Sequence, residues 1–190
     1  MQILVFDNYD SFTYNLVHII RELGFGEKME IFRNDRISLE EAGKFDKILL
    51  SPGPGLPADA GIMESLIRTY SKDKSILGIC LGHQGIAEVF GARIFNLPEV
   101  LHGVTKMVHL DTRKDPIFRN IPERVRACRY HSWAVAPDSI PEELEVTAMD
   151  EEEVIMGIRH KKYDVSGLQF HPEAYLTEHG MEMIDNWLKS

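Results

Sequence analysis

Short apolar runs alternate with amphipathic segments along the first half of the chain. Each run has the length and the nearly continuous apolar character of a strand that is buried on both faces of a parallel sheet. The runs are Gln2–Phe6, Lys28–Arg33, Lys44–Leu50 and Ser75–Ile79. Strand–helix alternation of this kind predicts an α/β fold, in which an open, mostly parallel sheet carries helices on both faces.

The segments between these runs predict helices. The first follows the polar turn Asp7–Ser11, with Ser11 as a candidate N-cap, and runs to about Leu23 with an apolar stripe on one face. Gly24 and Gly26 are expected to end it. Two further helices are expected at Ala60–Tyr70 and His83–Phe90.

Beyond Gly91 the pattern changes to a series of short strands separated by turns. The expected strands are Ala92–Asn96, Gly103–Leu110, Val125–Cys128, Leu144–Met149, Val154–His160 and Val165–Phe170. Such closely spaced runs suit antiparallel strands that extend or flank the parallel sheet. A last amphipathic segment, Leu176–Leu188, predicts a closing helix.

Size and composition place the chain among ordinary globular domains. Its 190 residues suffice for one domain, and 44% hydrophobic with 27% charged residues is the usual balance. A net charge of −9 argues against nucleic acid as a partner, because phosphates need a clustered basic surface. We interpret Arg124, Arg126 and Arg129 as the solvated face of one strand, and Asp150–Glu153 as a solvated turn.

Cysteine content and hydropathy favour a location in the reducing cytoplasm. The two cysteines, Cys80 and Cys128, make no disulfide framework. No apolar stretch is long enough to span a bilayer, and residues 1–6 do not resemble a signal peptide. The sequence has no zinc-like ligand spacing, Walker loop or dinucleotide-binding fingerprint, so neither a metal nor another cofactor is expected.

The segment Gly78-Ile79-Cys80-Leu81-Gly82 joins an expected strand to an expected helix. Strand, sharp turn and helix around G-x-C-x-G form the layout of a nucleophile elbow. The flanking glycines let the backbone turn tightly, which pushes the central side chain outward. Cysteine needs less activation there than serine does. The alternative is a buried structural cysteine between two loop glycines.

A thiol nucleophile needs a base, because its ordinary pKa of about 8.5 leaves it mostly protonated at neutral pH. Of the eight histidines, His171 directly follows an expected strand, where open α/β sheets place their sites. Glu173 lies two residues on and can orient the imidazole, while Pro172 stiffens the turn. A surface His-Pro-Glu turn is the alternative, but the elbow upstream favours a Cys80–His171–Glu173 triad.

Attack on an acyl group also requires donors for the developing oxyanion. In elbow enzymes one donor is the backbone N–H after the nucleophile, here that of Leu81. The loop Ser51-Pro52-Gly53-Pro54-Gly55 is the candidate for the second donor, because glycine backbones can approach a ligand closely. A plain structural turn is the alternative for this loop.

Several segments together carry a family resemblance. In order and spacing, Ser51–Gly55, Gly78–Gln84, Tyr130-His131-Ser132 and Phe170–Glu173 closely resemble the motifs of the class I (triad) glutamine amidotransferases. The opening Asp7–Asn15 is similar to that of the amidotransferase component of chorismate-using synthases, namely anthranilate synthase component II and its p-aminobenzoate-pathway counterpart, aminodeoxychorismate synthase. The resemblance implies one flavodoxin-like amidotransferase domain over residues 1–190, with flanking antiparallel strands.

The resemblance also implies a reaction and its residues. Cys80 attacks the side-chain amide of glutamine, His171 protonates the departing ammonia, and a water activated by His171 hydrolyses the glutamyl thioester. The residues implied to bind glutamine or to stabilise the oxyanion are Gly53, Pro54, Gly55, Leu81, Gln84, Ser132 and Trp133. The ammonia passes to a chorismate-binding synthase subunit, component I, and no cofactor is needed.

Three positions depart from the family pattern. Trp133 stands where leucine is usual, Ala174 follows His-Pro-Glu where serine is usual, and Val104 follows His102-Gly103 where lysine is common. The open alternatives are the same chemistry for another acceptor synthase, a stand-alone γ-glutamyl hydrolase, and a non-catalytic regulatory module. We expect no hydrolase, since the chain ends soon after its last helix without a secretion signal, and the intact triad disfavours a regulatory module.

Overall fold

The protein is described by a computed structural model, which gives the backbone of all 190 residues and the side chains of residues 1–97 and 103–190. The side chain of His102, which precedes the Gly103-Val104 departure, therefore lies outside the described residues. The strands are β1 Ile3–Asp7, β2 Met29–Arg33, β3 Lys47–Leu50, β4 Ser75–Ile79, β5 Ile94–Leu110, β6 Arg124–Val135, β7 Leu144–Asp150, β8 Ile155–His160 and β9 Val165–Leu168. The helices are α1 Thr13–Glu22, α2 Leu39–Ala42, α3 Met63–Tyr70, α4 Leu81–Val89 and α5 Gly180–Lys189, with 3₁₀ turns at Gly26–Lys28, Pro57–Asp59, Pro116–Phe118 and Pro137–Ser139.

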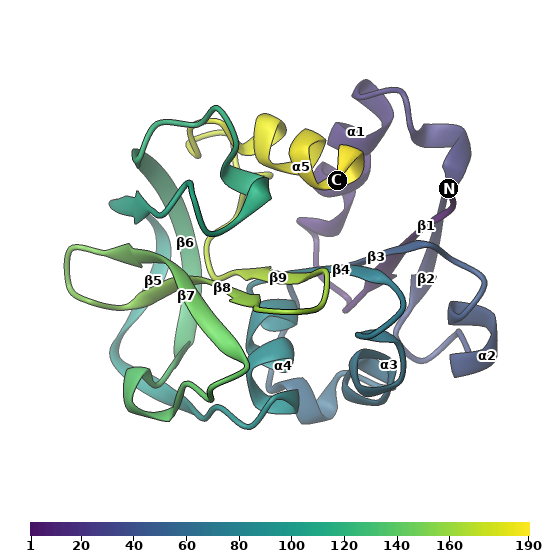
Figure 1. Ribbon diagram of the computed structural model, residues 1–190, viewed down its shortest axis with the longest axis horizontal. Helices are drawn as coiled ribbons and strands as arrows, with labels where there is room; N and C mark the ends of the chain where they lie inside the picture. Colours follow the sequence, from purple (N-terminus) through teal and green to yellow (C-terminus); the bar gives the residue numbers. More distant parts are fainter.

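The strands form one sheet in the order β2-β1-β3-β4-β9-β8-β7-β5-β6 (Figure 1). The first five in this order pair in parallel and reproduce the flavodoxin-like arrangement; we call them the parallel half. Strands β8, β7, β5 and β6 pair antiparallel and form the antiparallel half. The α/β fold expected from the sequence is confirmed.

The assignment of the strand near Val165–Phe170 to the antiparallel series was wrong. Strand β9 pairs in parallel with β4, from Ile76 opposite Val165 to Ile79 opposite Leu168, and antiparallel with β8 on its other edge. It thus joins the two halves. An apolar run shows that a strand is buried but not the direction of its neighbours, which is why the pattern missed this.

The antiparallel half also has longer strands than expected. The two runs predicted at 92–96 and 103–110 belong to the single strand β5, whose register against β6 shifts between Asn96 and Leu101 and again between His102 and Val104. Gly103 adopts a φ of +67° at the second shift. Such bulges interrupt the alternation of inward and outward side chains, so one strand resembled two.

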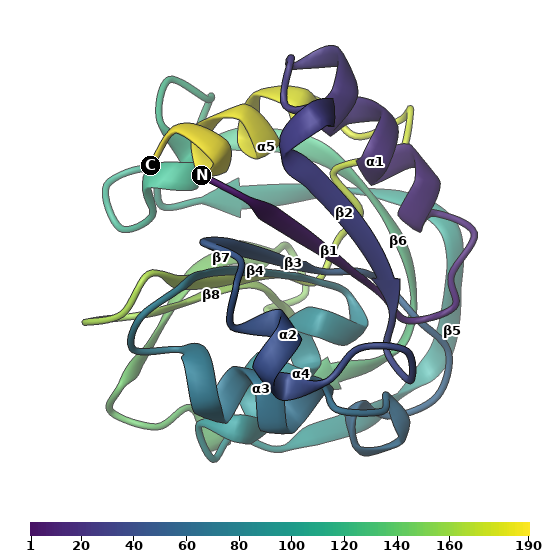
Figure 2. The same ribbon diagram turned by 90° about the vertical axis from the view of Figure 1, so that its right-hand side faces the viewer.

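Helices cover both faces of the sheet (Figures 1 and 2). Helices α1 and α5 lie on one face, and α2, α3 and α4 lie on the other. Successive residues of β1 divide between the two layers, because side chains alternate along a strand: Ile3 and Val5 belong to one core cluster, Leu4 and Phe6 to the other. None of the helices in the described residues is long and apolar enough to cross a membrane.

The start of α1 and the presence of α2 differ from the sequence prediction. Ser11 does not cap α1; the Asp10 carboxylate accepts from the backbone N–H of Phe12 at 2.8 Å instead, and the helix begins at Thr13. Gly24 ends α1 as expected, with a φ of +84°. The short helix α2 was not predicted, although Ser38 and Glu41 form a capping box at its start, a signal that is readable in sequence.

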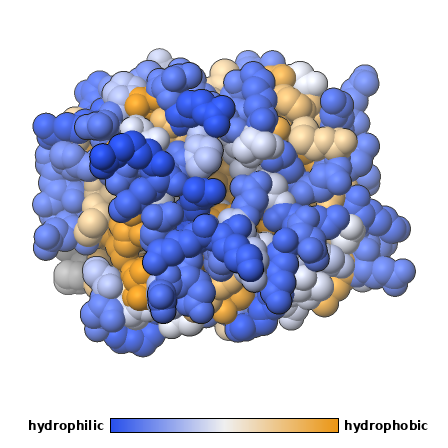
Figure 3. Space-filling model, viewed as in Figure 1, coloured by the Kyte–Doolittle hydropathy of each residue, from blue (hydrophilic) through white to orange (hydrophobic). Residues whose placement is uncertain are grey.

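The closing helix begins at Gly180, four residues later than expected at Leu176. The preceding segment 171–179 runs as turns beside the sheet. A Cβ on Gly180 would lie 1.8 Å from the carbonyl oxygen of Pro172, so α5 packs directly against the His-Pro-Glu segment. On the face seen in Figure 3, hydrophilic residues dominate and apolar residues form small separate groups.

Candidate active site

Cys80 forms the turn between β4 and α4. Its φ of 52° and ψ of −98° place a non-glycine residue in a sparsely populated region, which is the strain that a nucleophile elbow requires. The Cys80 N–H donates to the Leu168 carbonyl at 2.8 Å, and its carbonyl accepts from the Gln84 N–H at 3.1 Å. Both backbone groups are therefore fixed by neighbouring elements.

The two glycines around Cys80 are required by close backbone contact. A Cβ on Gly78 would lie 2.4 Å from the carbonyl carbon of Gly82. A Cβ on Gly82 would lie 2.7 Å from the carbonyl oxygen of Leu50, at the end of β3. The start of α4 thus packs directly on the strand ends, which explains the G-x-C-x-G spacing physically.

His171 and Glu173 lie together after β9. The His171 Nδ1 and a Glu173 carboxylate oxygen are 2.6 Å apart, and both side chains are almost fully buried. The rings of Phe12 and Tyr130 stand edge-on to the imidazole, with centroids at 5.3 and 5.2 Å. Because Glu173 occupies Nδ1, Nε2 is the ring nitrogen left for the thiol of Cys80.

The charge state of His171 reflects these neighbours. Burial lowers the pKa of the imidazole, but the neighbouring Cys80 thiol and the hydrogen-bonded Glu173 carboxylate outweigh it and raise the pKa above its usual value. An imidazolium beside Cys80 stabilises a thiolate. The three predicted triad residues are thus brought into one buried cluster at the carboxyl end of the parallel strands.

Strand β6 reaches this cluster although it lies at the far edge of the sheet. Its backbone is bonded to the segment after β9: the Cys128 carbonyl accepts from the His171 N–H at 3.0 Å, and the Arg126 carbonyl accepts from the Glu178 N–H at 2.9 Å. The Cys128 N–H donates to Thr177 Oγ1 at 3.0 Å. These bonds cover an exposed strand edge and bring Ser132 and Trp133 toward the site.

The loop 51–55 follows β3 and packs against the start of α4. A Cβ on Gly53 would lie 2.7 Å from the Leu81 side chain and 2.6 Å from that of Asn8. Asn8 holds the loop, since its N–H donates to Ser51 Oγ at 2.9 Å and its side-chain amide donates to the Ser51 carbonyl at 2.9 Å. Leu81 is the first residue of α4, where backbone N–H groups have no intrahelical acceptor.

A buried amide chain links Trp133 to the thiol. The Gln84 Nε2 donates to the Trp133 carbonyl at 2.9 Å and to Gln169 Oε1 at 3.1 Å. The Gln169 Nε2 in turn lies 3.6 Å from Cys80 Sγ. Sequence reasoning did not single out Gln169, although a glutamine at the end of an apolar strand and two residues before His171 was a readable signal.

The interpretation of Arg129 and Asp150 as solvated surface residues was wrong. Both side chains are fully buried and paired with each other, and the Arg129 Nε donates to His131 Nε2 at 3.1 Å. Arg124 and Arg126 are exposed as expected. Arg129 is an odd-numbered residue on β6, like the buried Val125 and Ala127, so alternation along the strand places it opposite the exposed Arg124 and Arg126; grouping the three arginines on one face overlooked this.

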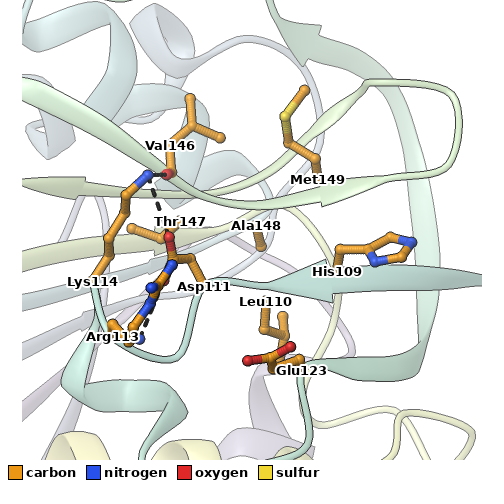
Figure 4. Close-up of a pocket in the computed structure, with 10 residues that line it drawn as sticks. All are labelled: His109, Leu110, Asp111, Arg113, Lys114, Glu123, Val146, Thr147, Ala148 and Met149. Carbon is orange, nitrogen blue, oxygen red and sulfur yellow. Dashed lines mark hydrogen bonds and ion pairs between the residues drawn. The ribbon is translucent and has the colours of Figure 1, made fainter.

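A separate hollow of about 400 Å³ lies between β5 and β7, away from Cys80 (Figure 4). Its cations are already engaged: Arg113 pairs with Asp111 at 3.4 Å, and the Lys114 ammonium donates to the Val146 carbonyl at 3.3 Å. It contains no nucleophile beside a base. We therefore do not assign the reaction to it.

The other histidines whose side chains are described form no metal site. Within residues 1–97 and 103–190, no group of three or more histidine, cysteine or carboxylate side chains is arranged to hold a metal ion. His83 is completely buried, and burial lowers its pKa to about 4. It packs against Gly167, where a Cβ would lie 2.9 Å from the His83 ring, which is a structural role.

Comparison with known proteins agrees with this geometry. The family described as "Glutamine amidotransferase class-I" matches residues 4–190. Anthranilate synthase component 2 of Cyanophora paradoxa is 43% identical over 98% of this chain and 97% of its own length. Aminodeoxychorismate synthase component 2 of Escherichia coli is likewise 43% identical, over 98% of each chain. The chain spans only 24% of the multifunctional tryptophan biosynthesis protein of Phycomyces blakesleeanus, to which it is 46% identical.

A solved structure shares the fold. The crystal structure of a protein assigned as one subunit of a GMP synthase from Thermoplasma acidophilum superposes with a TM-score of 0.88 at 26% identity, covering 100% of this chain and 92% of that one. The elbow cysteine, the family match and the full-length relatives all agree, and the chain belongs to the class-I glutamine amidotransferases.

Proposed function

We propose that this chain hydrolyses glutamine through a Cys80 thioester and delivers the ammonia to a chorismate-using synthase subunit. The observation that carries the proposal is the buried cluster of Cys80, His171 and Glu173 at the strand ends of a class-I amidotransferase. A nucleophile, a base and an orienting carboxylate are the parts that acyl transfer needs.

The reaction follows from the protonation of the cluster. The Cys80 thiolate attacks the side-chain amide carbon of glutamine, and the N–H groups of Leu81 and the Gly53–Gly55 loop stabilise the oxyanion. The imidazolium of His171 gives its proton to the amide nitrogen, so ammonia leaves and a glutamyl thioester remains. His171 then takes a proton from water as the water attacks the thioester, which releases glutamate and restores the thiolate.

Glutamine binding is proposed for the space between the oxyanion loop and β6. The Ser132-Trp133 backbone holds the amino-acid end of glutamine, with Gln84 beside it. In the structure the Gln84 Nε2 is already bonded to the Trp133 carbonyl, so we propose that Gln84 acts mainly by fixing this backbone. Pro54 keeps the neighbouring loop in an extended path.

The proposed partner follows from the relatives and from the surface. The relatives that match this chain along their whole length are component 2 of anthranilate and aminodeoxychorismate synthases, at 43% identity, well above the 26% of the GMP synthase neighbour. Tyr9, Tyr14 and Tyr175 follow β1 and β9 and are 48%, 62% and 99% exposed. Exposed aromatic side chains beside a site are typical of a protein interface.

The test is replacement of Cys80 by serine in the complex with the natural synthase partner. Glutamine-dependent product formation should fall by at least about 10³-fold, while synthesis from added ammonia should stay at the wild-type rate. Identification of the product then separates anthranilate from aminodeoxychorismate. Wild-type glutamine use by the Cys80→Ser complex would overturn the nucleophile assignment.

Labelling provides an internal control. A glutamine analogue with an electrophilic side chain should modify Cys80 and leave Cys128, which is 1% exposed on β6, untouched. Peptide mass spectrometry reads both cysteines in one sample. Modification of Cys128 alone would contradict the proposal.

A further inference from the structure

The Trp133 carbonyl is held from two sides by buried side chains. It accepts from the Gln84 Nε2 at 2.9 Å and lies 2.8 Å from the His131 Nδ1. His131 is 5% exposed and Gln84 is 3% exposed, so water does not compete strongly for either bond. The position of this carbonyl therefore depends on the orientation of two side chains.

Arg129 fixes the proton of His131. The Arg129 Nε lies 3.1 Å from His131 Nε2, and a guanidinium can only donate. The Nε2 must therefore accept, which puts the ring proton on Nδ1, facing the Trp133 carbonyl. Burial, together with the positive charge of Arg129, lowers the pKa of His131 to about 3, so the ring is neutral at physiological pH.

Arg129 is itself held by Asp150 at the end of β7. One oxygen of the Asp150 carboxylate binds the guanidinium, and the other accepts from the N–H groups of Glu152 and Val154 at 2.9 and 2.8 Å. Both side chains of the pair are fully buried. A buried ion pair is often no more stabilising than well-packed apolar residues, so stability alone does not explain it.

We propose that Arg129, held by Asp150, is a positioning residue for glutamine: it sets the Nδ1–H form of His131, which places the Trp133 carbonyl and the Ser132-Trp133 backbone for binding the amino-acid end of the substrate. The inference rests on the proposed function, and it assigns to the antiparallel half a role in glutamine affinity. Interactions made equally in the ground state and the transition state change KM and leave kcat unaltered. The network therefore governs KM for glutamine.

The decisive variant is the double substitution Arg129→Met with Asp150→Asn. It removes the donor to His131 without leaving an unpaired buried charge, and the asparagine oxygen can still accept from the turn at 152–154. We expect KM for glutamine to rise about tenfold, as loss of one buried hydrogen bond allows, with kcat within about twofold and ammonia-dependent synthesis unchanged.

A matched control lies on the same strand and turn. Arg124 and Glu151 form an exposed ion pair at 3.3 Å, with side chains 60% and 62% exposed, and Arg124→Gln with Glu151→Gln should leave KM at the wild-type value. A rise in KM equal to that of the buried pair would overturn the inference. So would an unchanged KM in the Arg129→Met, Asp150→Asn protein.

A second pair of variants tests His131 directly. Asparagine places an amide nitrogen where the imidazole Nδ1 stands, whereas leucine offers no donor. His131→Asn should therefore keep KM within about threefold of wild type, and His131→Leu should raise it about tenfold. Equal KM values for the two variants would overturn the role of the Nδ1 donor.

Ring ¹⁵N spectra separate the inference from the proposed function. In the wild-type chain His131 should show a neutral Nδ1–H ring, and the Arg129→Met, Asp150→Asn protein should lose that defined tautomer. An Nε2–H ring in the wild type would overturn the positioning role whatever the activity. Absence of glutaminase activity in the wild-type complex would overturn the proposed function and the inference that rests on it.

Discussion

The parallel and antiparallel halves place their functional groups by different physical means. In the parallel half, contacts between backbones fix the proposed nucleophile: a Cβ on Gly78 would lie 2.4 Å from the Gly82 carbonyl carbon, and one on Gly82 would lie 2.7 Å from the Leu50 carbonyl oxygen. In the antiparallel half, buried side chains do this work, since Asp150, Arg129 and His131 hold the backbone near Trp133.

The difference affects how each half tolerates change. A backbone contact requires glycine at one position, and almost any substitution there must displace a neighbouring strand. A side-chain network can lose a member and still leave the fold intact if charges stay balanced. The parallel half should therefore respond to substitution through the nucleophile, and the antiparallel half through substrate affinity.

His171 stands where the halves meet, and its replacement should give the largest effect. We expect His171→Ala to lower single-turnover thioester formation by at least about 10³-fold, because it removes both the base and the imidazolium. Glu173→Gln should cost about 10 to 100 times less, since the carboxylate orients the ring without exchanging its proton. Equal losses in rapid-quench measurements would instead indicate that Glu173 takes part in proton transfer.

Partner binding should act mainly on the parallel half. Cys80 is 6% exposed and His171 is 1% exposed, and the 51–55 loop must align its donors with the thiol. We expect the lone chain to be a poor glutaminase whose turnover rises by up to about 10²–10³-fold when the synthase partner binds, the cost of one misaligned oxyanion donor. Steady-state glutamine hydrolysis with and without the partner measures this.

One result would contradict the expected coupling between partner binding and glutaminase turnover. Full turnover by the isolated chain, unchanged on adding a partner that demonstrably binds, would remove the need for alignment. It would also shift weight to the stand-alone γ-glutamyl hydrolase alternative.

Substitution of two glycines in α4 tests whether close backbone contacts hold the parallel half together. Gly82→Ala should reduce the free energy of unfolding by roughly 1–3 kcal/mol, because the new Cβ would lie 2.7 Å from the Leu50 backbone. Gly85→Ala is the control: its Cβ would lie 2.7 Å from the terminal methyl of Met63, the end of a flexible side chain, and 3.5 Å from Ile67, with no backbone atom nearby. Urea denaturation measures both, and equal stabilities would contradict the close-contact explanation.

Titration of His171 and His131 should give the smallest of the expected differences between the two halves. Ring NMR should show His171 still protonated above its ordinary pKa of 6.5, since Cys80 and Glu173 outweigh burial and raise its pKa. His131, lowered to about 3 by burial and Arg129, should stay neutral. The native state then binds fewer protons at His131 than the unfolded state does, so stability falls as pH drops from about 6.5 toward 3.

A variant of His131 checks whether this residue causes the loss of stability at low pH. His131→Asn should remove that part of the acid destabilisation in denaturation curves measured between those pH values. If the acid limb is unchanged in the variant, the buried neutral state of His131 is not its source.

Local chemistry made much of the site readable in the sequence. The elbow and the His-Pro-Glu turn each need particular residue types at fixed spacing, so the sequence alone proposed Cys80, His171 and Glu173 as the triad. Strands β1 to β4 of the parallel half were also placed well, because burial on both faces gives continuous apolar runs. The capping box at Ser38 was equally readable and was overlooked.

Other features depended on contacts that no local pattern encodes. The parallel pairing of β9 with β4, the bulges of β5 and the burial of Arg129 against Asp150, 21 residues away, all arise between distant segments. A charged residue is usually solvated, so Arg129 resembled a surface residue until its partner was known.

The sequence by itself therefore determined the reaction class and the candidates for the catalytic residues, because the covalent chemistry and the tight turn are local requirements. Only the tertiary structure decided how the backbone at Trp133, proposed to hold glutamine, is fixed. Backbone hydrogen bonds join the outer edge of β6 to His171. In the interior of low polarity, the cost of an unpaired donor favours the bonds of Arg129 Nε to His131 and of His131 Nδ1 to the Trp133 carbonyl.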